Sequence, residues 1–133
     1  MVWEALVTDR LISVVDDDAS VRSATIDLLA SVGFLCEAFA SAEAYLQSAA
    51  ANRTLCLILD VRMPGLNGLE LQRLLTDQRR IVPIIFIPSY PDERTRQQAI
   101  EAGAICYLPK PYRVEELLDC IRLALERSRP ANQ

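Results

Sequence analysis

Three apolar runs of the sequence each lead into charged side chains. The runs and the charged residues that follow them are Leu11–Val15 with Asp16, Asp17 and Asp18, Leu55–Leu59 with Asp60, and Ala104–Leu108 with Lys110. Lys110 stands between two prolines and is the only lysine of the chain. Carboxylate oxygens are the ligands that Mg²⁺ prefers, and an ammonium group is a compact charge that can neutralise a phosphoryl oxygen. These residue types therefore suggest a site that holds a divalent metal ion and a phosphoryl group.

The aspartates could act in more than one way. Carboxylates that lie close together repel one another, so at least one of them should have a raised pKa unless a cation joins them. An aspartate can also attack phosphorus and form an acyl phosphate. Another interpretation is that each aspartate only caps the helix that follows it, and we prefer this interpretation for Asp18. For the other charged residues taken together it would require independent coincidences, so we favour the metal and phosphoryl site.

Strand and helix patterns alternate five times along the chain. The expected strands are Leu11–Val15, Phe34–Phe39, Leu55–Asp60, Pro83–Ile87 and Ala104–Leu108. Continuous apolar runs fit strands that are covered on both faces of a parallel sheet, and repeated βα units give right-handed crossovers. In such a sheet the ligand crevice lies at the carboxyl ends of the strands, which is where the charged residues fall. The sequence therefore predicts an α/β domain with its site at one edge of the sheet.

Start and stop signals mark the helices between these strands. The signals are Gly33 after an apolar stripe over Val21–Val32, Ser41 as a cap, Asn67 with Glu70 as a capping box, Pro91, Asp92 and Glu93 in the first turn of a helix that ends near Gly103, and an apolar stripe over Val114–Leu125. The helix that begins near Pro91 has little beyond Ala99 and Ile100 to pack. We therefore expect it to be the least firmly held helix.

The composition narrows the classes of function. The chain has a net charge of −4 and no histidine, which excludes histidine-based acid–base catalysis and histidine metal ligation. There is no basic footprint for nucleic acid, and no apolar run approaches the roughly 20 residues that span a bilayer. The acidity could be a solvated surface or could come in part from a metal site. The four cysteines show no paired metal spacing, and buried reduced thiols fit a cytoplasmic protein.

With 133 residues, the chain is long enough for one domain with a core on both faces of the sheet. We expect an N-terminal extension over residues 1–10, a domain over 11–127 and a tail over 128–133. Trp3, Leu6 and Val7 of the extension are apolar and could dock on the body of the domain.

Several of these motifs together resemble a known family. The motifs are Val14-Val15-Asp16-Asp17-Asp18, the segment Leu59–Gly68, Gly103-Ala104 and Lys110-Pro111. They are similar to the CheY-like receiver domain of bacterial response regulators, and Ser41-Ala42-Glu43 with the segment Asp60–Leu71 looks most like the FixJ-type subgroup. The resemblance covers about Leu11 to Leu125. It implies a flavodoxin-like, three-layer α/β/α fold with a five-stranded parallel sheet in the order 2-1-3-4-5.

The resemblance also implies roles for single residues. The implied roles are phosphoacceptor for Asp60, Mg²⁺ ligands for Asp16, Asp17, Asp60 and the main-chain carbonyl of Arg62, phosphoryl binding for Lys110, and a rotamer switch for Tyr107. Within the acidic pair, the resemblance favours Asp17 as the direct ligand.

Pro88 departs from the family pattern. Receivers carry threonine or serine at this position, where the hydroxyl binds the phosphoryl group and pulls the following loop inward. Proline has neither a hydroxyl nor an N–H to offer. Ser89 comes one place later, and its N–H could still reach the phosphoryl group. The departure argues against the usual coupling of phosphorylation to Tyr107, but it does not affect the chemistry at Asp60.

We therefore expect a phosphoreceiver of a two-component phosphorelay. A sensor histidine kinase or a phosphotransfer protein would donate to Asp60 with Mg²⁺ bound, and the altered face would signal to a protein target or to an output domain that this chain lacks. The sequence is compatible with a homodimer, and we expect no contact with membrane or nucleic acid. The chain would catalyse only its own phosphorylation and dephosphorylation, and would not be an enzyme that acts on a metabolite.

Two other classes of function compete with the phosphoreceiver. A pseudo-receiver would keep the fold as an interaction module without switching by phosphate, which Pro88 favours and the complete set of aspartates and lysine opposes. An aspartyl-phosphate phosphohydrolase would resemble a D-x-D pattern at the nucleophile. Here the second position of that pattern is Arg62, which disfavours this class.

Overall fold

The structure is a computed structural model that describes residues 11–127. The expected extension with Trp3, Leu6 and Val7, and the expected tail 128–133, lie outside the described residues.

The five strands form one parallel sheet. They are β1 (Leu11–Val15), β2 (Leu35–Phe39), β3 (Thr54–Leu59), β4 (Ile84–Phe86) and β5 (Cys106–Tyr107). Their order is β2-β1-β3-β4-β5 with every neighbouring pair parallel, which confirms the predicted fold. The pattern placed several strand ends one or two residues too far out. Ile87, for example, is fully buried and its N–H donates to the Leu59 carbonyl at 2.9 Å, although β4 ends at Phe86, so burial continues one residue past the strand.

Helices connect the strands, and their predicted start signals are present. The helices are α2 (Ala19–Ser31), α3 (Ala42–Gln47), the 3₁₀ helix η1 (Ala49–Asn52), α4 (Gly68–Asp77), α5 (Glu93–Glu101) and α6 (Val114–Arg127). The caps are Asp18 on α2, Ser41 on α3, the Asn67–Glu70 capping box on α4 and Asp92 on α5. Pro91 was expected in the first turn of α5 but precedes its cap, because the Asp92 side chain accepts from the Thr95 N–H and fixes the start at Glu93.

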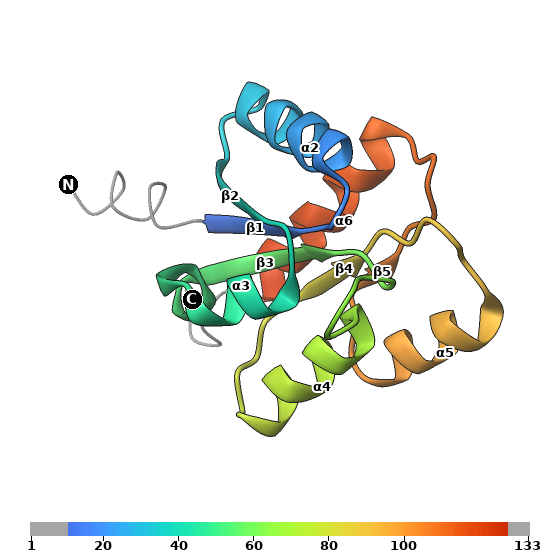
Figure 1. Ribbon diagram of the computed structural model, residues 1–133. Coiled ribbons are helices and arrows are strands. Elements are labelled where there is room, and N and C mark those ends of the chain that lie inside the picture. The colour runs from blue at the N-terminus through green and yellow to red at the C-terminus, as the bar shows by residue number, and fades with distance from the viewer. Residues whose placement is uncertain (1–10, 128–133) are drawn as a thin grey trace.

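Helices α2 and α6 cover one face of the sheet, and α3, α4 and α5 cover the other (Figure 1). On β1, Ile12 and Val14 belong to the core cluster that α2 and α6 close, whereas Leu11 and Val15 belong to the cluster that α3, α4 and α5 close. This alternation follows from the opposite orientation of successive side chains in a strand. Both faces are therefore sealed, and the edge at the carboxyl ends of the strands is left for a site.

Helix α5 is attached by few buried side chains. Ala99 is its only buried residue, and Ile100 is 39% exposed. The buried amide of Gln72 on α4 donates to the Ala99 carbonyl at 3.1 Å, which ties the two helices together. The expectation that α5 is the least firmly held helix stays a prediction.

The end of α4 carries an arginine in a conformation that favours glycine. Helices α2, α4 and α5 all end in a Schellman motif, in which two successive N–H groups donate back to carbonyls three and five residues earlier. The residue that makes the turn is Gly33 after α2, Arg79 after α4 and Gly103 after α5. Arg79 has φ of 60° and is the only residue other than glycine with positive φ in the described part of the chain. Its N–H donates to Thr76 at 2.9 Å, and the next N–H, of Arg80, donates to Leu75 at 2.8 Å.

We expect Arg79→Gly to stabilise the domain by about 0.5–1 kcal/mol. A side chain in the left-handed region costs roughly 1–2 kcal/mol, and the greater freedom of glycine in the unfolded chain offsets about half of that gain. Urea unfolding of the variant and the parent measures the difference. Arg80→Gly is the control, because Arg80 lacks positive φ and should lose stability on the same change. A loss in both variants would contradict the prediction.

Candidate functional site

The predicted charged residues follow strands that are neighbours in the sheet. Asp16 comes directly after β1, and Asp60 directly after the adjacent β3. The Asp60 N–H donates to the Val15 carbonyl at 3.0 Å, so the strand register holds the two aspartates side by side. Lys110 follows β5, and its N–H donates to the Pro88 carbonyl at 3.1 Å. The Lys110–Pro111 peptide bond is cis.

The three carboxylates that were predicted to hold a metal ion lie together. One oxygen each from Asp16, Asp17 and Asp60 falls within 4.8 Å of the other two. Asp16 is fully buried and Asp60 nearly so, whereas Asp17 is exposed. Hard oxygen donors around an open position fit Mg²⁺, which keeps several waters when it binds.

Lys110 follows the edge strand β5, and its side chain extends past β4 to this cluster beside β3 and β1. Its Nζ lies 2.9 Å from Asp16 Oδ2 and 3.7 Å from Asp60 Oδ2. The same ammonium donates to Ser89 Oγ at 3.0 Å. Lys110 is thus the cation that faces Asp60. Ser89 lies beside Lys110 at the exposed edge of the site.

Burial raises the pKa of the Asp60 carboxyl. The negative charges of Asp16 and Asp17 raise it further. The Lys110 ammonium opposes this rise, as does the Val61 N–H, which donates to Asp60 Oδ1 at 2.7 Å, but the net direction is upward. This agrees with the expectation that at least one clustered carboxylate has a raised pKa in the absence of a bound cation.

The residues expected to switch occupy different environments. Pro88 is buried at the end of β4, and Ser89 is exposed beside it. The Tyr107 ring packs against Phe86 with ring centroids 6.4 Å apart, and its hydroxyl is buried. Burial also raises the pKa of the Tyr107 phenol. The role of these three residues in a switch stays a prediction.

An open cleft of about 430 Å³ leads to the acidic cluster. It is lined by Asp17, Asp18, Asp60, Arg62, Ser89 and Tyr90. The Arg62 guanidinium lies over the Tyr90 ring, 5.3 Å from its centroid, so these two side chains form one wall. The predicted contribution of the Arg62 main-chain carbonyl to a metal site stays a prediction.

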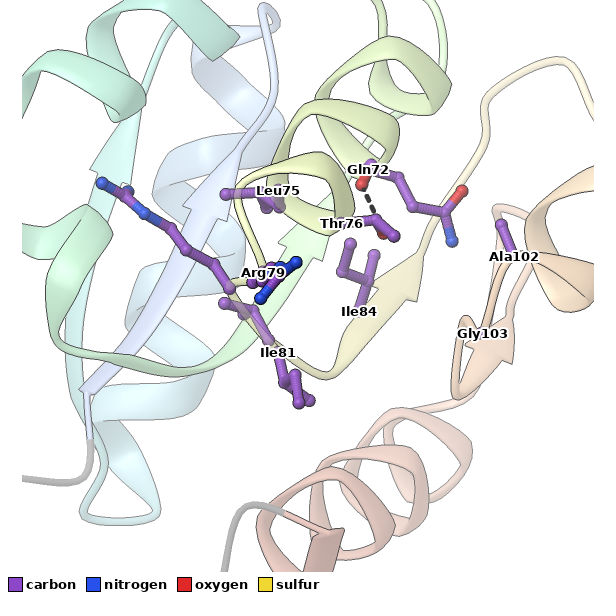
Figure 2. A pocket seen from close by; sticks show the side chains of 10 residues that line it. Gln72, Leu75, Thr76, Arg79, Ile81, Ile84, Ala102 and Gly103 are labelled. Atoms are coloured by element: carbon purple, nitrogen blue, oxygen red, sulfur yellow. Dashed lines mark hydrogen bonds between the residues drawn. The ribbon is translucent and has the colours of Figure 1, made fainter.

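Another hollow, shown in Figure 2, lies away from this cleft. It is bordered by the ends of α4 and α5, by residues that precede β4, such as Arg79 and Ile81, and by Ile84 at the start of β4. It therefore lies at the amino ends of the strands, and none of the predicted site residues lines it.

Gly68 is a site residue whose role the sequence interpretation missed. Its N–H donates to the Val61 carbonyl at 2.8 Å, which brings the start of α4 against the chain at the end of β3. A Cβ at this position would overlap the Asp60 carbonyl oxygen and lie 3.1 Å from Phe86 Cε1. A glycine just inside a helix start, where no positive φ requires it, is the signal that could have indicated such a close approach.

The chain matches one family model over most of its length. The model is that of the response regulator receiver domain, and it matches residues 12–122. The chain belongs to the response regulator receiver domain family. As a receiver domain it is a part of two-component signal transduction, and the resemblance to response regulators is confirmed.

Several curated relatives of this receiver domain are named as regulators. It is 43% identical over 122 residues to nodulation protein W of Bradyrhizobium diazoefficiens, which covers 92% of this chain and 54% of that protein. It is 34% identical over 126 residues to the transcriptional regulatory protein FixJ of the same species, covering 95% of this chain and 62% of that protein. The receiver domain thus spans about half the length of the curated relatives it matches.

Solved structures agree with the fold. The response regulator StyR has a TM-score of 0.81 and 42% identity, covering 90% of this chain and 60% of that one. The FixJ-N structure has a TM-score of 0.80 and 32% identity, covering 88% of this chain and 94% of that one. Within residues 11–127 the receiver domain contains no helix long and apolar enough to cross a membrane.

Proposed function

We propose that this receiver domain accepts a phosphoryl group on Asp60, with Mg²⁺, from the phosphohistidine of a sensor histidine kinase or phosphotransfer protein. The observation that carries the proposal is the meeting of three carboxylates with the ammonium of Lys110, 3.7 Å from Asp60 Oδ2. If the aspartates served only as helix caps, the position of the Lys110 ammonium beside Asp16 and Asp60 would have no explanation.

Each side chain has a role in the transfer. An Asp60 carboxylate oxygen attacks phosphorus as the bond to the donor nitrogen breaks, so an acyl phosphate forms. Lys110 is placed to move from Asp60 to a phosphoryl oxygen and offset its charge. Bound Mg²⁺, held by Asp16, Asp17 and Asp60, would supply further charge neutralisation. The chain's own chemistry would be limited to this transfer and to loss of the phosphoryl group to water.

The signal would leave by protein–protein contact. The chain spans about half the length of the relatives, since the match covers 54% of nodulation protein W, and this supports an output domain outside this chain or a separate protein target. We place the domain in the cytoplasm beside its kinase, without direct contact with membrane or nucleic acid, and a homodimer is one form in which it could signal.

Intact mass after exposure to acetyl phosphate tests the proposal. We expect a gain of one phosphoryl group that requires Mg²⁺ and is lost when the metal is chelated. The absence of any gain at saturating Mg²⁺ would contradict the phosphoacceptor function and favour an interaction module that does not use phosphate.

Mg²⁺ should stabilise the domain, and Asp17→Ala should remove most of that effect. A ligand that binds only the folded state adds about 1.4 kcal/mol at ten times its dissociation constant. Thermal melting over a series of Mg²⁺ concentrations measures the gain. Asp18→Asn is the control, because asparagine keeps the cap on α2 and Asp18 is not in the carboxylate cluster. A melting temperature of the parent that does not change with Mg²⁺ concentration would contradict the metal site.

A pseudo-receiver is the second candidate, and Pro88 is the observation that favours it. A threonine hydroxyl here would gain a hydrogen bond to the phosphoryl group of about 1.5–3 kcal/mol in the phosphorylated state alone. Such a difference between two states is what shifts a conformational equilibrium. Ser89 Oγ, 3.0 Å from Lys110 Nζ, is the hydroxyl that could replace it.

Pro88→Thr should enlarge the response of α5 and Tyr107 to phosphorylation. Amide exchange over residues 88–108, with and without a beryllofluoride mimic of the phosphoryl group, measures that response in the parent and the variant. Ser89→Ala in the parent serves as the comparison, since it removes the substitute hydroxyl. An equally large response in parent and Pro88→Thr would show that the missing hydroxyl does not limit the switch.

A further inference from the structure

Asp16 is held at every polar atom. Its N–H donates to the Phe39 carbonyl at 3.1 Å, Oδ1 accepts from the Asp18 N–H at 2.9 Å, and Oδ2 accepts from Lys110 at 2.9 Å. The remaining atom, the main-chain carbonyl oxygen, accepts from Arg22 Nη1 at 2.8 Å. Two of these partners are side chains, Lys110 and Arg22, and only Arg22 has had no role assigned.

Arg22 forms a hydrogen bond to each end of the loop Asp16–Asp18, which carries the acidic pair. It lies in the first turn of α2, where its N–H donates to the Asp18 carbonyl at 3.0 Å while its side chain returns to Asp16. The Asp16 carbonyl belongs to the planar peptide group that also contains the Asp17 nitrogen. A donor that is held on that carbonyl therefore fixes the orientation of the Asp16–Asp17 peptide plane, and with it the direction of the chain at Asp17.

The charge of Arg22 is used in an unusual way. Guanidinium groups pair well with carboxylates, and three aspartates lie in this loop, yet Arg22 forms no ion pair with any carboxylate of residues 11–127. A cation in the first turn of a helix also faces the positive end of the helix dipole. The half-buried guanidinium contacts a neutral carbonyl instead, which leaves the carboxylates available to a metal ion.

We propose that Arg22 is a positioning residue for the metal site: through the Asp16 carbonyl it orients the Asp16–Asp17 peptide so that the Asp17 carboxylate faces the cleft. The inference rests on the proposed Mg²⁺ site and adds a residue outside its ligand set. Groups that orient ligands are typically worth 10–100-fold in metal affinity. We expect Arg22→Met to weaken Mg²⁺ binding about tenfold.

The sign of the change separates positioning from simple charge. If Arg22 acted only as a nearby positive charge, its removal would reduce repulsion and tighten Mg²⁺ binding. Arg22→Met keeps much of the aliphatic stem but removes both charge and donors, whereas Arg22→Lys keeps the charge and an N–H donor. Positioning therefore predicts the affinity order parent, Arg22→Lys, Arg22→Met, from tightest to weakest.

The test is a Mg²⁺ titration of the full chain, followed by the amide shifts of residues 60–63 at a temperature where all variants are folded. A parallel assay measures phosphorylation by acetyl phosphate against Mg²⁺ concentration. We expect Arg22→Met to raise the half-saturating Mg²⁺ concentration about tenfold while the extent of phosphorylation at saturating Mg²⁺ stays near that of the parent. A residue that only stabilised the fold would lower the melting temperature without moving that concentration.

An unchanged or tighter affinity in Arg22→Met would overturn the positioning role while leaving the metal site intact. A parent chain that shows no Mg²⁺-dependent shifts would overturn the metal site itself, and the role of Arg22 with it. The two failures are therefore distinguishable in one series of titrations.

Discussion

The Asp60→Asn variant is expected to gain no phosphoryl group from acetyl phosphate at any Mg²⁺ concentration. Among the clustered carboxylates, Asp60 lies in the open cleft and faces Lys110, whereas Asp16 is fully buried with both oxygens hydrogen-bonded. The amide of asparagine has the same shape but does not act as the oxygen nucleophile of a carboxylate. The expected effect is therefore complete loss of the mass gain, with the fold retained.

Intact mass with and without Mg²⁺ measures this result. Asp18→Asn is the matched control, since it makes the same chemical change two residues from Asp16 at a cap that asparagine can keep. That control should be phosphorylated like the parent. A normal mass gain in Asp60→Asn would move the acceptor to another side chain and undo the assignment.

The sequence predicts the framework of the site because that framework depends on local patterns. Buried parallel strands are continuous apolar runs, and the first polar residue after such a run marks the carboxyl end of the strand. Asp16 and Asp60 could therefore be placed at one edge before their neighbours were known. Side-chain caps are equally local, which is why Asp18 and the Asn67–Glu70 box were predicted correctly.

Other features depend on contacts between distant segments and leave weaker traces. The approach of Gly68 to Asp60, and the hydrogen bond from Arg22 to Asp16, are set by how helices pack on the sheet. The start of α5 shows the same limit on a smaller scale. Pro91 and Asp92 are both good starting residues, and only the hydrogen bond from the Thr95 N–H decides between them.

Replacing Gly68 by alanine should both destabilise the domain and slow phosphorylation. The added Cβ would overlap the main-chain oxygen of Asp60, and a backbone atom cannot swing aside as the end of a flexible side chain can. The start of α4 must then move away from the end of β3, where Asp60 lies. Overpacking of this kind costs about 1–3 kcal/mol, and displacement of a reacting group by about 1 Å can slow a reaction by about 10²-fold.

Gly103→Ala is the control that separates the two effects. Gly103 has φ of 104°, so alanine is strained there, but its Cβ would meet no atom within 4 Å. Strain at such a position costs about 1–3 kcal/mol, which is similar to the loss expected at Gly68. Urea unfolding should therefore show comparable losses, whereas the rate of phosphorylation at saturating Mg²⁺ should fall only in Gly68→Ala. Equal rates in the two variants would mean that Gly68 matters to packing alone and that the acceptor tolerates movement of α4.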